Sequence, residues 1–130
     1  MKIILWLILI NASLFAAPIF AGEDTCATVS AQIEKSGPWD VTKWMSTQPK
    51  RWESLLSHIE TGSVCWLSVA REIYVGCDGA VCLGIQSAVA RALLRAPDRV
   101  LALVGHDNFN VDRVCMPFIS EDEPDAKVLF

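Results

Sequence analysis

The chain has 130 residues, a length that suits one domain, and its 11 basic and 15 acidic side chains give a formal net charge of −4. This acidic excess argues against a nucleic-acid partner, whose phosphates require clustered lysine and arginine, and against charge-driven docking on anionic lipid. The composition therefore favours a small globular protein that binds neither nucleic acid nor a lipid surface.

The first segment predicts a cleavable signal peptide over residues 1–21. Lys2 is followed by an uncharged apolar run to Ala17, and the small residue Ala21 precedes Gly22. A basic start, an apolar core and a small final residue are typical of secretory signals. The run of about 14 residues is shorter than the ~20 that a bilayer-spanning helix needs. We therefore expect a mature protein that begins near Gly22, is secreted or periplasmic, and has no membrane span.

Residues 22–120 are predicted to form a helical domain, because apolar residues recur at helical spacing and do not alternate as they would in strands. The first helix is expected from Thr25 to Lys35, and a short turn follows for which Asp40 is the candidate N-cap. Another helix begins at Pro49, which suits the first helical position, and ends at Gly62. The inward residues of the two helices are expected to be Cys26, Val29, Ile33, Trp52, Leu55, Leu56 and Ile59.

Three further helices are expected before the chain becomes irregular. Ser63 is the candidate N-cap of a helix that ends at Gly76, Asp78 is the candidate N-cap of the next, and Pro97 opens a short helix that stops at Gly105. Their inward residues are expected to be Trp66, Val69, Ala70, Ile73, Ile85, Ala88, Val89, Ala92, Leu93, Val100, Leu101 and Val104.

Short links between these helices predict an all-α fold, a small disulfide-stapled helical bundle of antiparallel neighbours. The helix starts at Pro49 and Pro97 have similar sequences, so a short HEAT-like array of paired helices stays open as a second arrangement. Beyond Gly105 the chain is rich in turn residues and interrupted by proline, which favours an irregular C-terminal strap. Residues 121–130 are expected to be an acidic tail.

Part of this pattern resembles a known group of proteins. The residues concerned are Trp66-Leu67, Val69-Ala70, Asp78, 88–93, Pro97, Val100-Leu101 and the segment Cys115-x-Pro117-Phe118-Ile119. They are similar to those of a group of small secreted helical proteins from proteobacteria that has no assigned activity. The resemblance implies a helical fold and a Gram-negative envelope location, and it transfers no site residue.

All five cysteines lie beyond the predicted signal: Cys26, Cys65, Cys77, Cys82 and Cys115. In an oxidising compartment they should pair, and an odd number leaves one thiol that is free or joins two chains as a dimer. Spacing does not fix the connectivity, although Cys77 and Cys82 are the favoured local pair. Cys115 is expected to gain most from a bond to Cys26 or Cys65, while Cys65 has the strongest case for a plain core thiol.

No group of residues predicts catalysis, a cofactor or a metal. His58 and His106 fall on different elements, and Cys77 and Cys82 lack the two-residue spacing of zinc ligands and redox motifs. Ser63 is better explained as a helix cap than as a nucleophile. We therefore expect no catalytic residue, no cofactor and no metal site.

Four tryptophans crowd into one part of the domain, at Trp39, Trp44, Trp52 and Trp66. Each is large enough to anchor a helix in the core, and tryptophan is also enriched at the centre of protein interfaces. A third interpretation is a stacking platform for a glycan. Trp39 follows a Gly-Pro pair in a loop, so we expect it to be the most exposed, and Trp39 and Trp44 are the candidate binding residues.

Together these features predict a secreted or periplasmic macromolecule-binding protein without catalytic activity. Its most concrete form is an inhibitor or immunity-type partner of an envelope enzyme or toxin, so we expect a protein partner in the cell envelope. Two alternatives stay open. One is a small envelope enzyme or thiol redox factor that uses the odd cysteine, and the other is an accessory subunit of a surface assembly.

Overall fold

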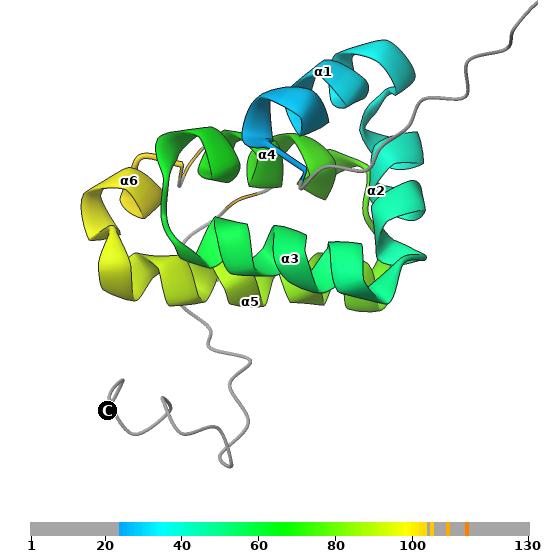
Figure 1. The fold of residues 1–130 in the computed structure, drawn as a ribbon. Coiled ribbons are helices and arrows are strands. Elements are labelled where there is room, and N and C mark those ends of the chain that lie inside the picture. Colours follow the sequence, from blue (N-terminus) through cyan, green and yellow to red (C-terminus); the bar gives the residue numbers. More distant parts are fainter. Residues whose placement is uncertain (1–23, 104, 106–108, 110–113, 115–130) are drawn as a thin grey trace, which may run out of the picture.

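A computed structural model describes residues 24–103, 105, 109 and 114, and this part of the chain contains six helices and no strand (Figure 1). The all-α bundle predicted from the sequence is therefore confirmed. The predicted signal peptide and acidic tail and most of the predicted strap lie outside the described residues. The helices are α1 Cys26–Ser36, α2 Pro38–Ser46, α3 Pro49–Glu60, α4 Val64–Val75, α5 Gly79–Arg95 and α6 Pro97–Leu101.

The helices pack around α4, which contacts α1, α2, α3 and α5. Figure 1 shows α3 and α5 side by side, with α1 and α2 at one end of the bundle and α6 at the other. The similar sequences at Pro49 and Pro97 open helices of different length, 12 residues in α3 and five in α6. The end of the bundle formed by α2 carries the two candidate binding residues, Trp39 and Trp44.

Local chemistry explains most helix starts. The side chain of Thr25 accepts a hydrogen bond from the backbone N–H of Thr28 at 3.2 Å, and that of Ser63 accepts one from Trp66 at 3.3 Å. The predicted cap at Ser63 is therefore confirmed. Proline occupies the start of α2, α3 and α6, where its missing N–H removes no helical hydrogen bond.

One predicted cap, Asp40, is wrong, and another, Asp78, is at the predicted position but makes no side-chain bond. Helix α2 begins at Pro38, three residues earlier than an N-cap at Asp40 would place it, so Asp40 lies inside its first turn and Gly37 is the N-cap. Asp78 does occupy the N-cap position of α5, but its side chain accepts no capping hydrogen bond. The carboxylate of Asp78 is therefore left for other contacts, which matters for the site described below.

Two glycines allow close approaches between helices. Gly62 follows α3 at a φ of 69°, and a Cβ there would lie 2.5 Å from the Cβ of Ala96. Gly76 ends α4 against the start of α2, where a Cβ would lie 2.5 Å from the carbonyl carbon of Pro38. Only glycine permits the second contact, and it brings the α4–α5 link beside α2.

The core is built from the predicted apolar stripes, with a few differences. Buried hydrophobic residues include Val29, Ile33, Leu55, Ile59, Val69, Ala70, Ile73, Ile85, Ala88, Val89, Ala92 and Val100, all expected to point inward. Trp52, Leu56, Trp66 and Leu93 are partly buried and pack against this core. The inward prediction for Leu101 is wrong: it is 51% exposed, because the single turn of α6 buries Val100 and leaves its neighbour outside. Val104 lies outside the described residues.

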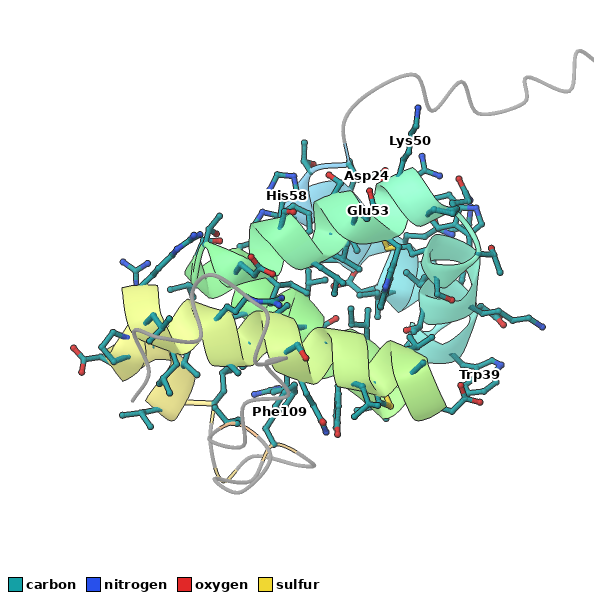
Figure 2. All side chains as sticks on the ribbon, turned by 90° about the horizontal axis from the view of Figure 1, so that it is seen from below. Asp24, Trp39, Lys50, Glu53, His58 and Phe109 are labelled. Atoms are coloured by element: carbon teal, nitrogen blue, oxygen red, sulfur yellow. A yellow bond between two sulfur atoms is a disulfide. The ribbon has the colours of Figure 1, made fainter. Side chains whose placement is uncertain are left out.

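A contact between two polar side chains lies inside the core. The amide Nε2 of Gln86 donates a hydrogen bond to the hydroxyl of Tyr74, which satisfies both buried polar groups. The ring of Phe109 packs on Tyr74 with a centroid distance of 4.6 Å (Figure 2). Phe109 is 1% exposed and seals this side of the bundle, a core position that the turn-rich sequence around it did not predict.

Two disulfides staple the bundle. Cys77 and Cys82 join the α4–α5 link to the first turn of α5, with their Cα atoms 5.2 Å apart, so the predicted local pair is confirmed. Cys26 pairs with Cys65 at a Cα distance of 6.1 Å and ties the start of α1 to the start of α4. The prediction of a core thiol at Cys65 is wrong, because this residue faces out of α4 toward α1.

The same pair overturns the expected bond from Cys115 to Cys26 or Cys65, since both of these sulfurs are already used. Cys115 itself lies outside the described residues. Disulfides form and persist where thiols are oxidised, so the two pairs suggest an extracytoplasmic environment. Within residues 24–103, none of the helices combines the length and the apolar character that crossing a bilayer requires.

A candidate binding surface on helix α2

Helix α2 exposes two tryptophans. Its inner side buries Val41, Thr42 and Met45, which leaves positions 39, 40, 43 and 44 on the outer side. Trp39 is 53% exposed and Trp44 is 37% exposed, so both candidate binding residues lie at the surface. We call this outer side, formed by Trp39, Asp40, Lys43 and Trp44, the α2 surface.

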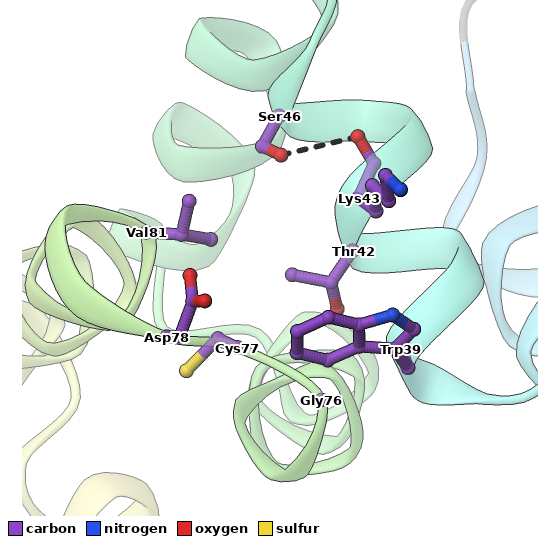
Figure 3. A pocket seen from close by; sticks show the side chains of 8 residues that line it. All are labelled: Trp39, Thr42, Lys43, Ser46, Gly76, Cys77, Asp78 and Val81. Carbon is purple, nitrogen blue, oxygen red and sulfur yellow. Dashed lines mark hydrogen bonds between the residues drawn. The ribbon is translucent and has the colours of Figure 1, made fainter.

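A pocket of about 200 Å³ opens beside Trp39, between α2 and the link from α4 to α5 (Figure 3). We call it the Trp39 pocket. Its lining comes from two segments that are far apart in the sequence: Trp39, Thr42, Lys43 and Ser46 from α2, and Gly76, Cys77, Asp78 and Val81 from the link and the start of α5.

The walls of the Trp39 pocket are held firmly. The hydroxyl of Thr42 lies 2.7 Å from the carbonyl oxygen of Pro38 and 3.1 Å from that of Ile73, and the second contact fastens α2 to α4. Gly76 packs on the backbone at the start of α2. The Cys77–Cys82 disulfide closes the opposite wall into a short ring. The pocket is therefore a preformed feature of the fold.

Three functional groups of the pocket are not used by the fold. Within the described part of the chain, the indole N–H of Trp39, the ammonium group of Lys43 and the carboxylate of Asp78 form no hydrogen bond or ion pair. The hydroxyl of Ser46, by contrast, donates to the carbonyl oxygen of Lys43 at 3.1 Å (Figure 3). An aromatic face, a cation and an anion are thus all available to a ligand.

Trp44 lies at the other edge of the α2 surface from the Trp39 pocket, where a second pocket of about 190 Å³ is lined by Gln32, Ser36, Asp40, Val41 and Trp44. The guanidinium of Arg51 covers the ring of Trp44 at 4.3 Å from its centroid. Arg51 also bonds the carboxylate of Asp24 at 2.5 Å and the side-chain oxygen of Gln48 at 2.9 Å. Trp44 is therefore partly engaged in holding the N-terminal end of the domain, and Trp39 is the freer of the two.

The other two tryptophans serve the bundle. Trp52 packs against the core from α3, and its ring lies next to Gly84 of α5. Trp66 stacks on the imidazole of His58 with ring centroids 4.6 Å apart and planes 5° from parallel. The four tryptophans thus divide into two that pack and two that lie on the α2 surface, a division that spacing alone could not supply.

The structure also describes how the sulfur and histidine side chains are used. Cys77 and Cys82 are bonded to each other, and His58 is stacked on Trp66. Across the described residues, no group of three or more histidine, cysteine, aspartate or glutamate side chains is arranged to hold a metal ion.

Comparison with known proteins finds no family model, no curated protein and no solved structure that matches this chain. The resemblance to small secreted helical proteins of proteobacteria therefore stays a prediction.

Proposed function

We propose that this protein is a secreted or periplasmic macromolecule-binding protein without catalytic activity, and that it binds a protein partner through the α2 surface. The most concrete form is an inhibitor or immunity-type partner of an envelope enzyme or toxin. The observation that carries the proposal is Trp39, a large aromatic side chain that is 53% exposed at the rim of a preformed pocket.

An exposed tryptophan on a rigid helix suits a binding role. Burying its ring against a partner would remove a large apolar area from water, and tryptophan is enriched among the few residues that dominate binding energy. Because α2 is fastened to α4, little ordering would accompany binding. The net charge of −4 would also speed the approach of a basic partner surface.

The binding role is tested by purifying the protein with its partner from the envelope fraction and comparing two variants. Trp39→Ala should lose the partner, because it removes the anchor of the α2 surface. Leu101→Ala is the matched control, since Leu101 is 51% exposed but lies on α6 at the other end of the bundle. Equal capture by both variants, or equal loss, would contradict the proposed surface.

The location is tested by mass spectrometry of the protein isolated from the envelope fraction. Because the start of the chain has the pattern of a signal peptide, the mature N-terminus should fall within a few residues of Gly22. An envelope protein that keeps Met1 would contradict this part of the proposal.

A further inference from the structure

We propose that the Trp39 pocket receives an arginine side chain of the protein partner. This inference rests on the proposed function and goes further, because it names the chemistry that the α2 surface recognises. It is carried by the position of an indole and an unused carboxylate on facing walls of one pocket.

Both walls attract a cation. The indole ring of Trp39 is exposed at the pocket, and the π faces of such rings bind guanidinium and ammonium groups. Figure 3 shows the carboxylate of Asp78 across the pocket from this ring, on the α4–α5 link. Asp78 accepts no capping hydrogen bond from α5, so its two oxygens can accept the paired N–H groups of a guanidinium.

The size and the lining of the pocket fit one side chain. A volume of about 200 Å³ is below the ~300–1,000 Å³ typical of pockets that bind drug-sized molecules. Val81 and Cys77 contribute apolar lining for the methylene stem of an arginine. Arginine is preferred over lysine because its planar head can stack on the indole and bond a carboxylate at the same time.

Charge favours this occupant over the alternatives. A carboxylate ligand would meet Asp78, whereas a cation gains from Asp78 and from the net charge of −4 of the whole chain. Lys43 at the rim opposes a cation, but it is exposed, so water and salt screen the repulsion. A neutral sugar ring would instead use Lys43 as a hydrogen-bond donor. The effect of removing the Lys43 charge therefore has opposite signs for the two ligand classes.

The test titrates the isolated protein with a blocked Gly-Arg-Gly peptide and with its uncharged isostere, blocked Gly-citrulline-Gly. Binding is followed by NMR at the indole N–H of Trp39, identified as the signal that Trp39→Phe removes. The indole signals of Trp52 and Trp66 serve as internal controls. We expect the arginine peptide to shift the Trp39 signal. The citrulline peptide should bind at least about fivefold more weakly than the arginine peptide.

Three variants test whether each side chain strengthens or weakens binding of the arginine peptide. Asp78→Asn should weaken binding of the arginine peptide about twofold to fivefold, and Lys43→Gln should strengthen it by up to about threefold. Asp98→Asn, which removes an exposed carboxylate from α6 at the other end of the bundle, should leave the affinity unchanged. All three side chains are exposed, so each variant should keep the dispersed spectrum of the folded protein.

Equal binding of the two peptides, or weaker binding by Lys43→Gln, would overturn the proposal. In the second case, binding of neutral oligosaccharides at the same signal would assign the pocket to a glycan. These outcomes are separate from the proposed function: if the peptide fails but Trp39→Ala still loses the partner, the α2 surface stands and only the arginine is wrong.

Discussion

At the scale of single residues, the two kinds of tryptophan differ in what they contribute to the folded state. Trp39 meets solvent with half of its surface and makes no hydrogen bond with the described residues, whereas Trp52 lies between α3 and α5 against the core. A residue can therefore matter for binding or for stability, and the two effects can be separated by substitution.

We expect Trp52→Ala to lower the free energy of unfolding by about 3 kcal/mol, because it leaves a cavity between two packed helices. Trp39→Ala should change it by less than about 0.5 kcal/mol, as is usual for surface substitutions. Denaturant unfolding followed by circular dichroism measures both. A loss of stability in Trp39→Ala as large as that in Trp52→Ala would place Trp39 in the core.

Gly76 and Gly84 make a second matched pair at this scale. Gly76→Ala should destabilise the protein by about 2 kcal/mol, since the added Cβ meets the backbone at the start of α2, which must shift. Gly84→Ala adds a Cβ 3.3 Å from the ring of Trp52, and the gain in helix propensity should hold the change within about 1 kcal/mol. Thermal melts that rank the two variants the other way would show that the α2–α4 contact is loose.

At the scale of elements, the two disulfides constrain segments of very different length. The Cys26–Cys65 bond closes a separation of 39 residues and the Cys77–Cys82 bond one of five. In the chain-entropy model, the longer loop contributes about 4 kcal/mol and the shorter about 2 kcal/mol. The short bond shapes one wall of the Trp39 pocket, so its role is local.

We therefore expect a double serine variant of Cys26 and Cys65 to unfold at a lower denaturant concentration than that of Cys77 and Cys82. The second variant should stay folded but change the environment of the Trp39 indole, which NMR reports directly. An unchanged Trp39 signal in that variant would show that the disulfide does not shape the pocket.

The helices are also the part of the structure that the sequence predicted best. Helical spacing identified the buried stripes of α3, α4 and α5, and Ser63 and the prolines marked helix starts, because these signals are local. The cap at Asp40 was wrong, and Asp78 is the predicted N-cap but makes no side-chain capping bond. An aspartate near a helix start can cap, lie in the first turn or face solvent, and its neighbours in space decide which. For the same reason the partner of Cys65 and the buried position of Phe109 depend on contacts between distant segments.

The candidate site shows the same division. Trp39 is exposed as predicted, but it lies in the first turn of α2 and not in a loop. The pocket beside it is formed by α2 and the α4–α5 link together. Sequence alone does not show that Asp78 leaves its carboxylate free of capping, because this depends on the three-dimensional arrangement at the start of α5. The sequence therefore predicted the exposed residue Trp39 but not the pocket beside it.

At the scale of the whole molecule, the count of cysteines sets a test. Four of the five are paired within the described residues, so thiol alkylation under denaturing, non-reducing conditions should label at most one position per chain. That position should be Cys115, or none if two chains are joined through it. Labelling at Cys77 or Cys82 would show that the disulfide in the wall of the Trp39 pocket does not form.

The order of the paired cysteines along the chain has a consequence for biosynthesis. Each bond joins two cysteines that are consecutive in the sequence: Cys26 bonds Cys65, and Cys77 bonds Cys82. In a chain that enters an oxidising compartment from its N-terminus, each thiol thus meets its native partner before any later cysteine arrives. We expect a thiol oxidase alone to complete both bonds, so the yield of native protein should not depend on a disulfide isomerase.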